Sequence, residues 1–331
     1  MRGKSSRHRA KMTKNALIFI LLLAATTASA HDNRTLDRTE SADPQSLFTL
    51  DFANDVIYDT NKSFSNRFRF IFTTPFMEHS PVNFMLIPNN RGDSVFYSLT
   101  VQHDIYSPEE KFDIATQFTQ TPYAAFLMIG SKKEAFNKTK KYKLTSQLQL
   151  GVLGPLAFGE EISNGIHRIF PEAVQARGWE NQIGTDFCIM YTAGIEKNIV
   201  DAGWFNLDVI SAGALGNPFT RLDGGVAMRT GLFADYFENF GFSNSKHWQV
   251  FLYGNVRARF VGYDATLQGG LFSDNSIYTR DDVRRALGRF VAGLSIIHGN
   301  IKIELENHFT TPGFEAGDSH KWGNLNIQFR Y

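Results

Sequence analysis

The sequence predicts an all-β fold, a transmembrane antiparallel β-barrel of about 12 strands with a short α-helix in an extracellular loop. Three observations predict it. After Gln45 the chain is a series of segments of about ten residues in which apolar and polar side chains alternate; the polar positions are rich in Lys, Arg, Gln and Asn; and the apolar positions begin or end in Trp, Tyr or Phe. Alternation alone would also fit a soluble β-sandwich, but the aromatic ends and the strongly polar side favour an outer-membrane barrel.

The first 30 residues are typical of a secretory signal peptide, because basic residues precede the apolar run Ala16 to Ala25 and an A-x-A site that ends at Ala30. We expect a flexible N-terminal lead-in over residues 31–45 and the barrel domain over residues 46–331. The signal peptide holds six of the 34 basic residues and none of the 33 acidic ones, so a mature chain carries 28 basic residues and a net charge of −5. This charge gives no support for nucleic acid as a partner.

The sequence also argues against membrane-spanning helices after the signal peptide and against internal disulfides. No later segment has the roughly 18 consecutive apolar residues that a transmembrane helix needs. The single cysteine, Cys188, cannot form an internal disulfide.

The strands follow one another with similar spacing. The last segment shows the pattern most clearly: apolar Trp322, Leu325, Ile327, Phe329 and Tyr331 are interleaved with polar Asn324, Asn326, Gln328 and Arg330. Strands are expected to begin near Leu47, Arg67, Val95, Thr121, Lys141, Asp186, Trp204, Leu222, Trp248, Arg285, Ile301 and Trp322.

An even strand number puts both ends of the barrel on the periplasmic side, so the links from odd to even strands are expected to be extracellular. Short links at 198–203 and 298–300 then become periplasmic turns. The long link from Thr74 to Ser94 does not fit this rule.

The stretch from Gly151 to Gln182 interrupts the strand pattern with one amphipathic helix, in the third extracellular link. Its apolar face is formed by Ile162, Ile166, Ile169 and Phe170, and Ser163, His167 and Pro171 lie beside that face. His167 would therefore sit next to an apolar surface, either as a reactive group or as the hydrogen-bonded histidine of a packed helix.

The topology gathers polar residues at the extracellular rim. The expected cluster contains Asn54, Asp55, Ser65, Asn66, Tyr106, Ser107, Pro108, Lys111 and His167. Asn54 and Asp55 offer hard oxygen ligands that suit Ca²⁺, and a nearby histidine can take a proton from water, which together make an ester hydrolase site. Strict alternation cannot point both Asn54 and Asp55 into the lumen, so one must act from a bulge or from the rim. A purely structural role for Asn54 and Asp55 is the alternative, because an Asn-Asp pair is common in turns and at strand ends.

Nucleophilic schemes have less support. The chain contains no G-x-S-x-G motif. Ser65 or Ser107 would remain candidates for activation by His167 if the fold brought them within hydrogen-bond reach.

Several motifs resemble the lipid A 3'-O-deacylase family of outer-membrane enzymes: FANDV (52–56), HDIYSP (103–108), GVLGPLAFGEEISNGIHRI (151–169), GWENQ (178–182) and GALGNPF (213–219). Their order and spacing match over nearly the whole mature chain. The resemblance implies a twelve-stranded barrel with a site between the wall and a loop helix on the extracellular side. It also implies Ca²⁺-dependent removal of the acyl groups ester-linked at the 3' position of lipid A.

By position, the resemblance assigns roles to residues of this chain. Asn54 and Asp55 match the family's Asn-Asp pair, Ser65 stands at a hydroxyl position, His167 matches the catalytic histidine, and Glu172 falls near a family glutamate. The expected catalytic residues are thus His167, Ser65 and Asn54, and the expected metal ligands are Asp55 and Asn54. Two departures are visible. Ser163 stands where family members usually have Gln, and only Lys111 is available for the basic pair of the loop after the third strand. Lys111, Glu172 and Ser163 are therefore the expected substrate-binding residues.

These features predict a lipid A deacylase in the outer membrane of a Gram-negative bacterium, with lipopolysaccharide as substrate, Ca²⁺ as cofactor and the barrel assembly machinery as a partner. A second interpretation is a catalytically altered barrel with a binding or structural role, suggested by Ser163 and the reduced basic loop. A third, a passive pore, is disfavoured by a helix-bearing loop that would occupy the mouth.

Overall fold

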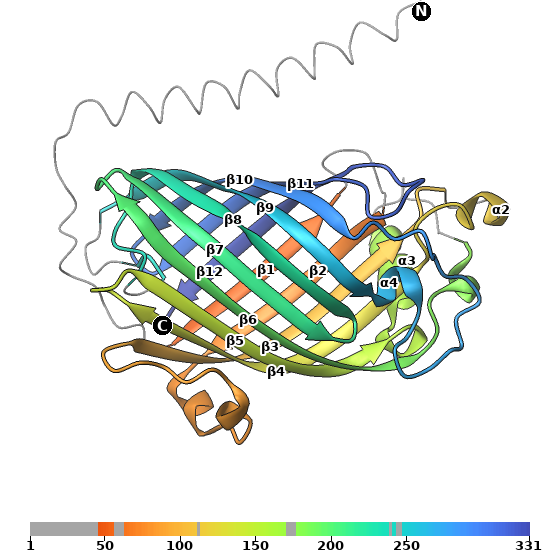
Figure 1. Cartoon of the computed structure of the whole chain (residues 1–331), viewed down its shortest axis with the longest axis horizontal. Coiled ribbons are helices and arrows are strands. Elements are labelled where there is room, and N and C mark those ends of the chain that lie inside the picture. The colour runs from red at the N-terminus through yellow and green to blue at the C-terminus, as the bar shows by residue number, and fades with distance from the viewer. Residues whose placement is uncertain (1–45, 56–62, 111–112, 170–176, 238–239, 243–246) are drawn as a thin grey trace, which may run out of the picture.

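Twelve antiparallel strands close into one barrel (Figure 1). The computed structural model describes residues 46–55, 63–110, 113–169, 177–237, 240–242 and 247–331, so the expected signal peptide and lead-in lie outside the described residues. The strands are β1 (Leu47–Asn54), β2 (Ser63–Thr73), β3 (Ser94–Ser107), β4 (Ala124–Asn137), β5 (Tyr142–Leu153), β6 (Asp186–Asp201), β7 (Phe205–Gly216), β8 (Phe219–Leu232), β9 (Gln249–Asp264), β10 (Ala286–His298), β11 (Ile301–Thr310) and β12 (His320–Arg330). Each pairs with its sequence neighbours, and β1 closes on β12, with Leu47 opposite Arg330. The expected fold is confirmed, and every expected strand begins within four residues of an observed one.

The α-helices gather at one end of the barrel, which is called the loop end (Figure 1). They are α2 (Ile114–Gln117), α3 (Gly159–Ile169) and α4 (Ala265–Gln268), with the short 3-10 segments η4 (Pro155–Ala157) and η5 (Trp179–Asn181). The start of β1 and the end of β12 lie at the opposite end, which is called the terminal end. In the part of the chain that the structure describes, no helix has the length and apolar character needed to cross a membrane.

Alternation separates a polar lumen from an apolar outer face. In β8, Leu222, Val226 and Met228 are exposed on the outside, whereas Asp223 faces inward and its carboxylate binds Arg259 of β9 (2.7 Å). Charged groups inside a barrel are tolerated when they are paired and hydrogen-bonded. The lipid-facing and lumen-facing positions therefore follow the period-2 pattern of the sequence.

Apolar side chains fill both ends of the lumen. At the terminal end, Phe233, Phe240 and Phe242 from the β8–β9 link pack against Leu47 and Phe136 of the wall. Toward the loop end a second cluster joins the wall to α4 and to the β5–β6 link; it includes Phe126, Leu153, Ile183, Cys188, Phe219 and Ala265. Cys188 is a buried free cysteine, as expected. This packing of the described residues argues against a passive pore.

The outward position expected for Trp322 is wrong. Leu325 is opposite the exposed Leu305 and shares its outer face, and Trp322 lies three residues before Leu325, so alternation turns Trp322 inward. Its ring packs 5.4 Å from that of Phe64 and stacks on His308 at 4.9 Å. Trp322 therefore belongs to the lumen core and not to an aromatic girdle.

Candidate active site

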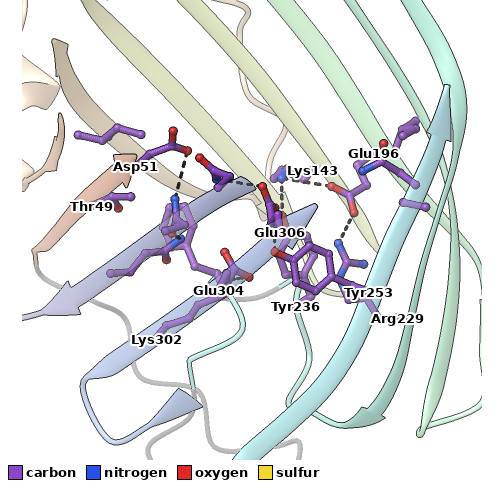
Figure 2. Close-up of a pocket in the computed structure, with 18 of the residues that line it drawn as sticks. Thr49, Asp51, Lys143, Glu196, Arg229, Tyr236, Tyr253, Lys302, Glu304 and Glu306 are labelled. Carbon is purple, nitrogen blue, oxygen red and sulfur yellow. Dashed lines mark hydrogen bonds and ion pairs between the residues drawn. The ribbon is translucent and has the colours of Figure 1, made fainter. Parts of the chain in front are cut away.

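A cavity of about 410 Å³ lies in the lumen (Figure 2). Most of its charged side chains are paired with one another: Asp51 with Arg69 (2.8 Å), Lys132 with Glu134 (2.8 Å), Lys143 with Glu196 (3.2 Å), and Lys302 with Glu304 (3.0 Å). Arg229 bridges Glu196 and Asp208. Since these charges already satisfy one another, the network is interpreted as structural and not as a catalytic centre.

A second cavity lies on the outer face of the barrel, between the wall and the β5–β6 link. This wall–helix slot holds about 250 Å³ and is almost entirely apolar. Its lining comes from β2, β3 and β4 on one side and from η4 and α3 on the other: Phe68, Phe70, Val101, His103, Leu127, Ala157, Phe158 and Ile162. A cavity of this composition on a lipid-facing wall suits a hydrocarbon chain.

Polar residues border the slot on its loop-end side. Asn54 of β1 and Asn66 of β2 are cross-strand partners, and the Nδ2 of Asn54 donates to the Oδ1 of Asn66. Asn66 lies two residues before Phe68 on the same strand face, about 7 Å away along the strand. The amide pair therefore adjoins the mouth of the apolar slot.

A β-bulge interrupts β2 beside this pair. The β2–β3 register shifts between Phe64 and Asn66, which makes Ser65 the extra residue. Bulges are common next to active sites because they re-aim side chains and the backbone. Of the two expected possibilities for Asn54 and Asp55, a bulge or the rim, Asp55 lies past the end of β1, and the bulge is on the neighbouring strand.

Asp55 directly follows β1, and its side chain is fully buried. A carboxylate and neighbouring amide oxygens are ligand types that Ca²⁺ accepts, and the Nδ2 of Asn54 donates to the Oδ1 of Asn66. Among the described residues there is no group of three or more His, Cys, Asp or Glu that would hold a metal ion. The residues present therefore fit a Ca²⁺ site that is completed by amide, water or substrate oxygens and not a cage of carboxylates.

Helix α3 is held tightly against the wall. Gly159 begins it, and a Cβ at this position would lie 2.4 Å from the Cβ of Ala125 and 3.0 Å from the Trp179 ring. Ser163 is buried on this helix, and the backbone of His167 follows it by one turn. The predicted helix is confirmed, and His167 lies in the segment that covers the slot.

Trp179 and Tyr123 form the support behind α3. Their rings lie 4.5 Å apart, and both side chains are almost completely buried together with Ile105, Ala125 and Ala157. Burial raises the pKa of the Tyr123 hydroxyl above its ordinary value, so this group stays neutral. Trp179 and Tyr123 thus form an uncharged packing surface that fixes the distance between α3 and the barrel wall.

Two slot residues had no assigned role in the sequence analysis. His103, within the HDIYSP motif, donates from Nε2 to the carbonyl of Ala157 (2.7 Å) and so ties η4 to β3. Phe158 adopts a left-handed backbone (φ 58°), which is rare for an aromatic residue and marks a constrained position. The alternation of β3 turns His103 outward, but no sequence signal indicated the left-handed turn at Phe158.

The rim cluster divides between the two faces of the barrel. Tyr106 points into the lumen, where its ring packs 5.6 Å from that of Phe64, because it alternates with the outward-facing Ile105. Tyr106, expected in the polar cluster at the extracellular rim, therefore lies on the lumen side, whereas the Asn54–Asn66 pair lies on the outer face. Lys111 and Glu172 lie outside the described residues.

The family model of outer membrane protein LpxR matches residues 17–331 of the sequence. The chain belongs to the LpxR family. Among solved structures, LpxR from Salmonella typhimurium is similar at a TM-score of 0.68 and 19% identity, over 86% of this chain and 100% of that one. The β domain of the Bordetella autotransporter BrkA matches at a TM-score of 0.45 and 6% identity, over 86% of this chain and 98% of that one. No curated protein matches the sequence.

LpxR family membership and the closed barrel place this protein in the outer membrane. Outer-membrane barrels turn their longer loops outward and their short turns to the periplasm. The loop end, with α2, α3 and α4, is accordingly the extracellular end, and the slot opens on the wall below it.

Proposed function

We propose that this LpxR family member is a lipid A 3'-O-deacylase, a carboxylic ester hydrolase that removes the ester-linked 3' acyl groups of lipid A. The observation that carries the proposal is the wall–helix slot, an apolar cavity on the outer face that borders the Asn54–Asn66 pair. An acyl chain of a membrane lipid would lie in the slot, and its ester and sugar would then lie at the polar rim. The motif resemblance to lipid A 3'-O-deacylases supports the same substrate.

The reaction requires a water nucleophile and a base. His167 takes a proton from water, and the water oxygen attacks the ester carbonyl carbon. The bond from that carbon to the sugar oxygen then breaks, and the imidazolium returns its proton to the departing sugar oxygen. The products are a free fatty acid and a lipid A with a free 3' hydroxyl.

The remaining site residues bind and orient. Asp55 and Asn54 would hold Ca²⁺, which, when bound, supplies positive charge to polarise the ester carbonyl. Ser65, at the bulge, positions the sugar, and Lys111 binds a phosphate. Ser163 and Glu172 also bind the substrate.

Mass spectrometry of lipid A from cells that express the protein tests this proposal. We expect loss of the 3'-linked chains, with EGTA stopping the purified enzyme and Ca²⁺ restoring it. Asp55→Asn is expected to weaken the Ca²⁺ response far more than Ser65→Ala, because a carboxylate holds a hard cation against water better than an amide does.

Two outcomes would contradict parts of the scheme. Equal activity in EGTA would remove Ca²⁺ and favour Ser65 as nucleophile, with an inactive Ser65→Ala and an acyl-enzyme adduct detectable by mass. Unchanged lipid A beside a correctly assembled barrel would favour the binding or structural role.

A further inference from the structure

The link between β2 and β3, residues 74–93, lies outside the barrel wall and is called the strap. It contains the 3-10 segments η2 (Pro75–His79) and η3 (Asn83–Met85). Figure 1 shows the strap, in orange, beside β3, β4 and β5 on the outer side of the barrel near the terminal end. A short turn would suffice to join the two strands, so its length has another use.

The wall beneath the strap is polar. Ser131 and Lys133 of β4 and Ser146 of β5 are only 4%, 6% and 1% exposed. They alternate with Lys132 and Lys143, which line the lumen cavity, and therefore face outward. Polar groups on the lipid-facing wall of a barrel are costly unless they are hydrogen-bonded.

The strap supplies these hydrogen bonds. The Oγ of Ser131 donates to Asn83 (3.1 Å), the Nζ of Lys133 donates to Asn89 (2.9 Å), and the backbone N–H of Ile87 donates to Ser146 (3.1 Å). Asp93 fixes the end of the strap by accepting from Asn137 (2.8 Å) and from Tyr142 (2.7 Å).

Part of the strap lies at the depth of the lipid acyl chains. Ser131 lies six residues from Asn137, the terminal-end residue of β4. At about 3.3 Å per residue and a strand tilt of about 40°, the contact with Asn83 lies roughly 15 Å up the wall. The apolar band of an outer-membrane barrel is about 25 Å tall, so this height falls within it.

The strap is polar on the side that faces the barrel wall and apolar on the side that faces away from it. Phe76, Phe84 and Met85 are 77%, 86% and 48% exposed. Around the strap, the exposed Phe72 of β2 and Ile129 of β4 belong to the lipid-facing band of the barrel itself. The strap thus adds exposed apolar side chains to a wall whose neighbouring strands carry that band.

We propose that the strap lies in the periplasmic leaflet of the outer membrane, with Phe76, Phe84 and Met85 among phospholipid acyl chains. Over the periplasmic half of β3, β4 and β5, the strap and not the strands faces the lipid. The strap covers the polar side chains of these strands. The exposed Glu78 and His79 of η2 then lie at the level of the lipid headgroups.

Single-cysteine labelling of the full-length protein in phosphatidylcholine vesicles tests this proposal. The native Cys188 is buried in the lumen, so a cysteine introduced at Phe84→Cys can be labelled selectively with an environment-sensitive NBD fluorophore. Met85→Cys provides a second position if the first variant fails to assemble. Arg91→Cys is the matched control, because Arg91 is exposed on the same strap close to Asp93 at the barrel end.

We expect lipids with a nitroxide on the acyl chain to quench the probe at position 84 or 85 at least threefold more than the probe at position 91. Aqueous iodide should show the reverse order. Iodide quenching at 84 and 85 equal to that at 91, in barrels that keep their heat-modifiable gel mobility, would overturn the proposal. That result would favour a protein partner for the apolar surface, since the vesicles contain none.

Discussion

Replacing Gly159 by alanine tests whether the contact of α3 with the wall sets the reaction rate. The added Cβ would lie 2.4 Å from the Cβ of Ala125, and carbon atoms in contact prefer about 3.5 Å, so α3 must move by about 1 Å. Ala125 has no rotatable side-chain atom that could relieve the overlap, and Trp179 closes the second side at 3.0 Å. Overpacking of this kind costs about 1–3 kcal/mol.

The expected effect on deacylation is larger than the effect on assembly. A displacement of about 1 Å in a group that positions a reaction can cost about 10²-fold in rate. The rate is measured as release of 3'-linked chains from lipid A by mass spectrometry, and assembly as the gel shift between heated and unheated protein. We expect Gly159→Ala to keep the gel shift and to lose about 10²-fold in rate.

Gly165→Ala is the matched control on the same helix. A Cβ at Gly165 meets no atom within 4 Å, so alanine adds no overlap and stabilises the helix by about 1 kcal/mol. Its deacylation rate should remain at the wild-type level. Wild-type activity in Gly159→Ala would refute the reasoning that the height of α3 above the wall controls the chemistry.

Three more results are expected. His167→Asn should lower the deacylation rate by at least about 10²-fold without loss of the gel shift, and a mutant rate near that of the wild type would remove His167 from the mechanism. Arg67→Met removes the cationic partner of the fully buried Asp104 (2.7 Å), which should destabilise the barrel by about 3–5 kcal/mol. The temperature at which the barrel loses its unheated gel position should therefore drop, and an unchanged temperature would contradict this. Removal of residues 329–331 should reduce the outer-membrane fraction, because Arg330 and Phe329 close the barrel on β1, and normal assembly would show that this closure is dispensable.

The sequence predicted the barrel well because the information lies in local alternation. Each strand carries its own period-2 pattern, and the neighbours of an antiparallel barrel are also neighbours in sequence, so the order of the strands followed from their count. Trp322 was assigned to the wrong face because an aromatic residue at a strand end fits both the lumen core and a girdle.

The site was harder to predict because it depends on contacts between distant segments. Alternation excluded a common lumen position for Asn54 and Asp55, but it did not reveal that the bulge lies in β2 at Ser65. The docking of α3 depends on the missing Cβ of Gly159 and on the left-handed backbone of Phe158, and neither leaves a periodic signal. The strap was seen only as a link of unusual length, since its use depends on the outer faces of β4 and β5.

The position of the wall–helix slot on the outer face determines how an enzyme of this kind meets its substrate. A lipid reaches such a slot by lateral diffusion in the plane of the leaflet, so its encounter rate follows the mole fraction of substrate in that plane. Diluting the vesicles in buffer would leave turnover per enzyme unchanged, whereas diluting the substrate with inert lipid would lower it. Kinetic constants for this protein therefore belong in units of surface concentration.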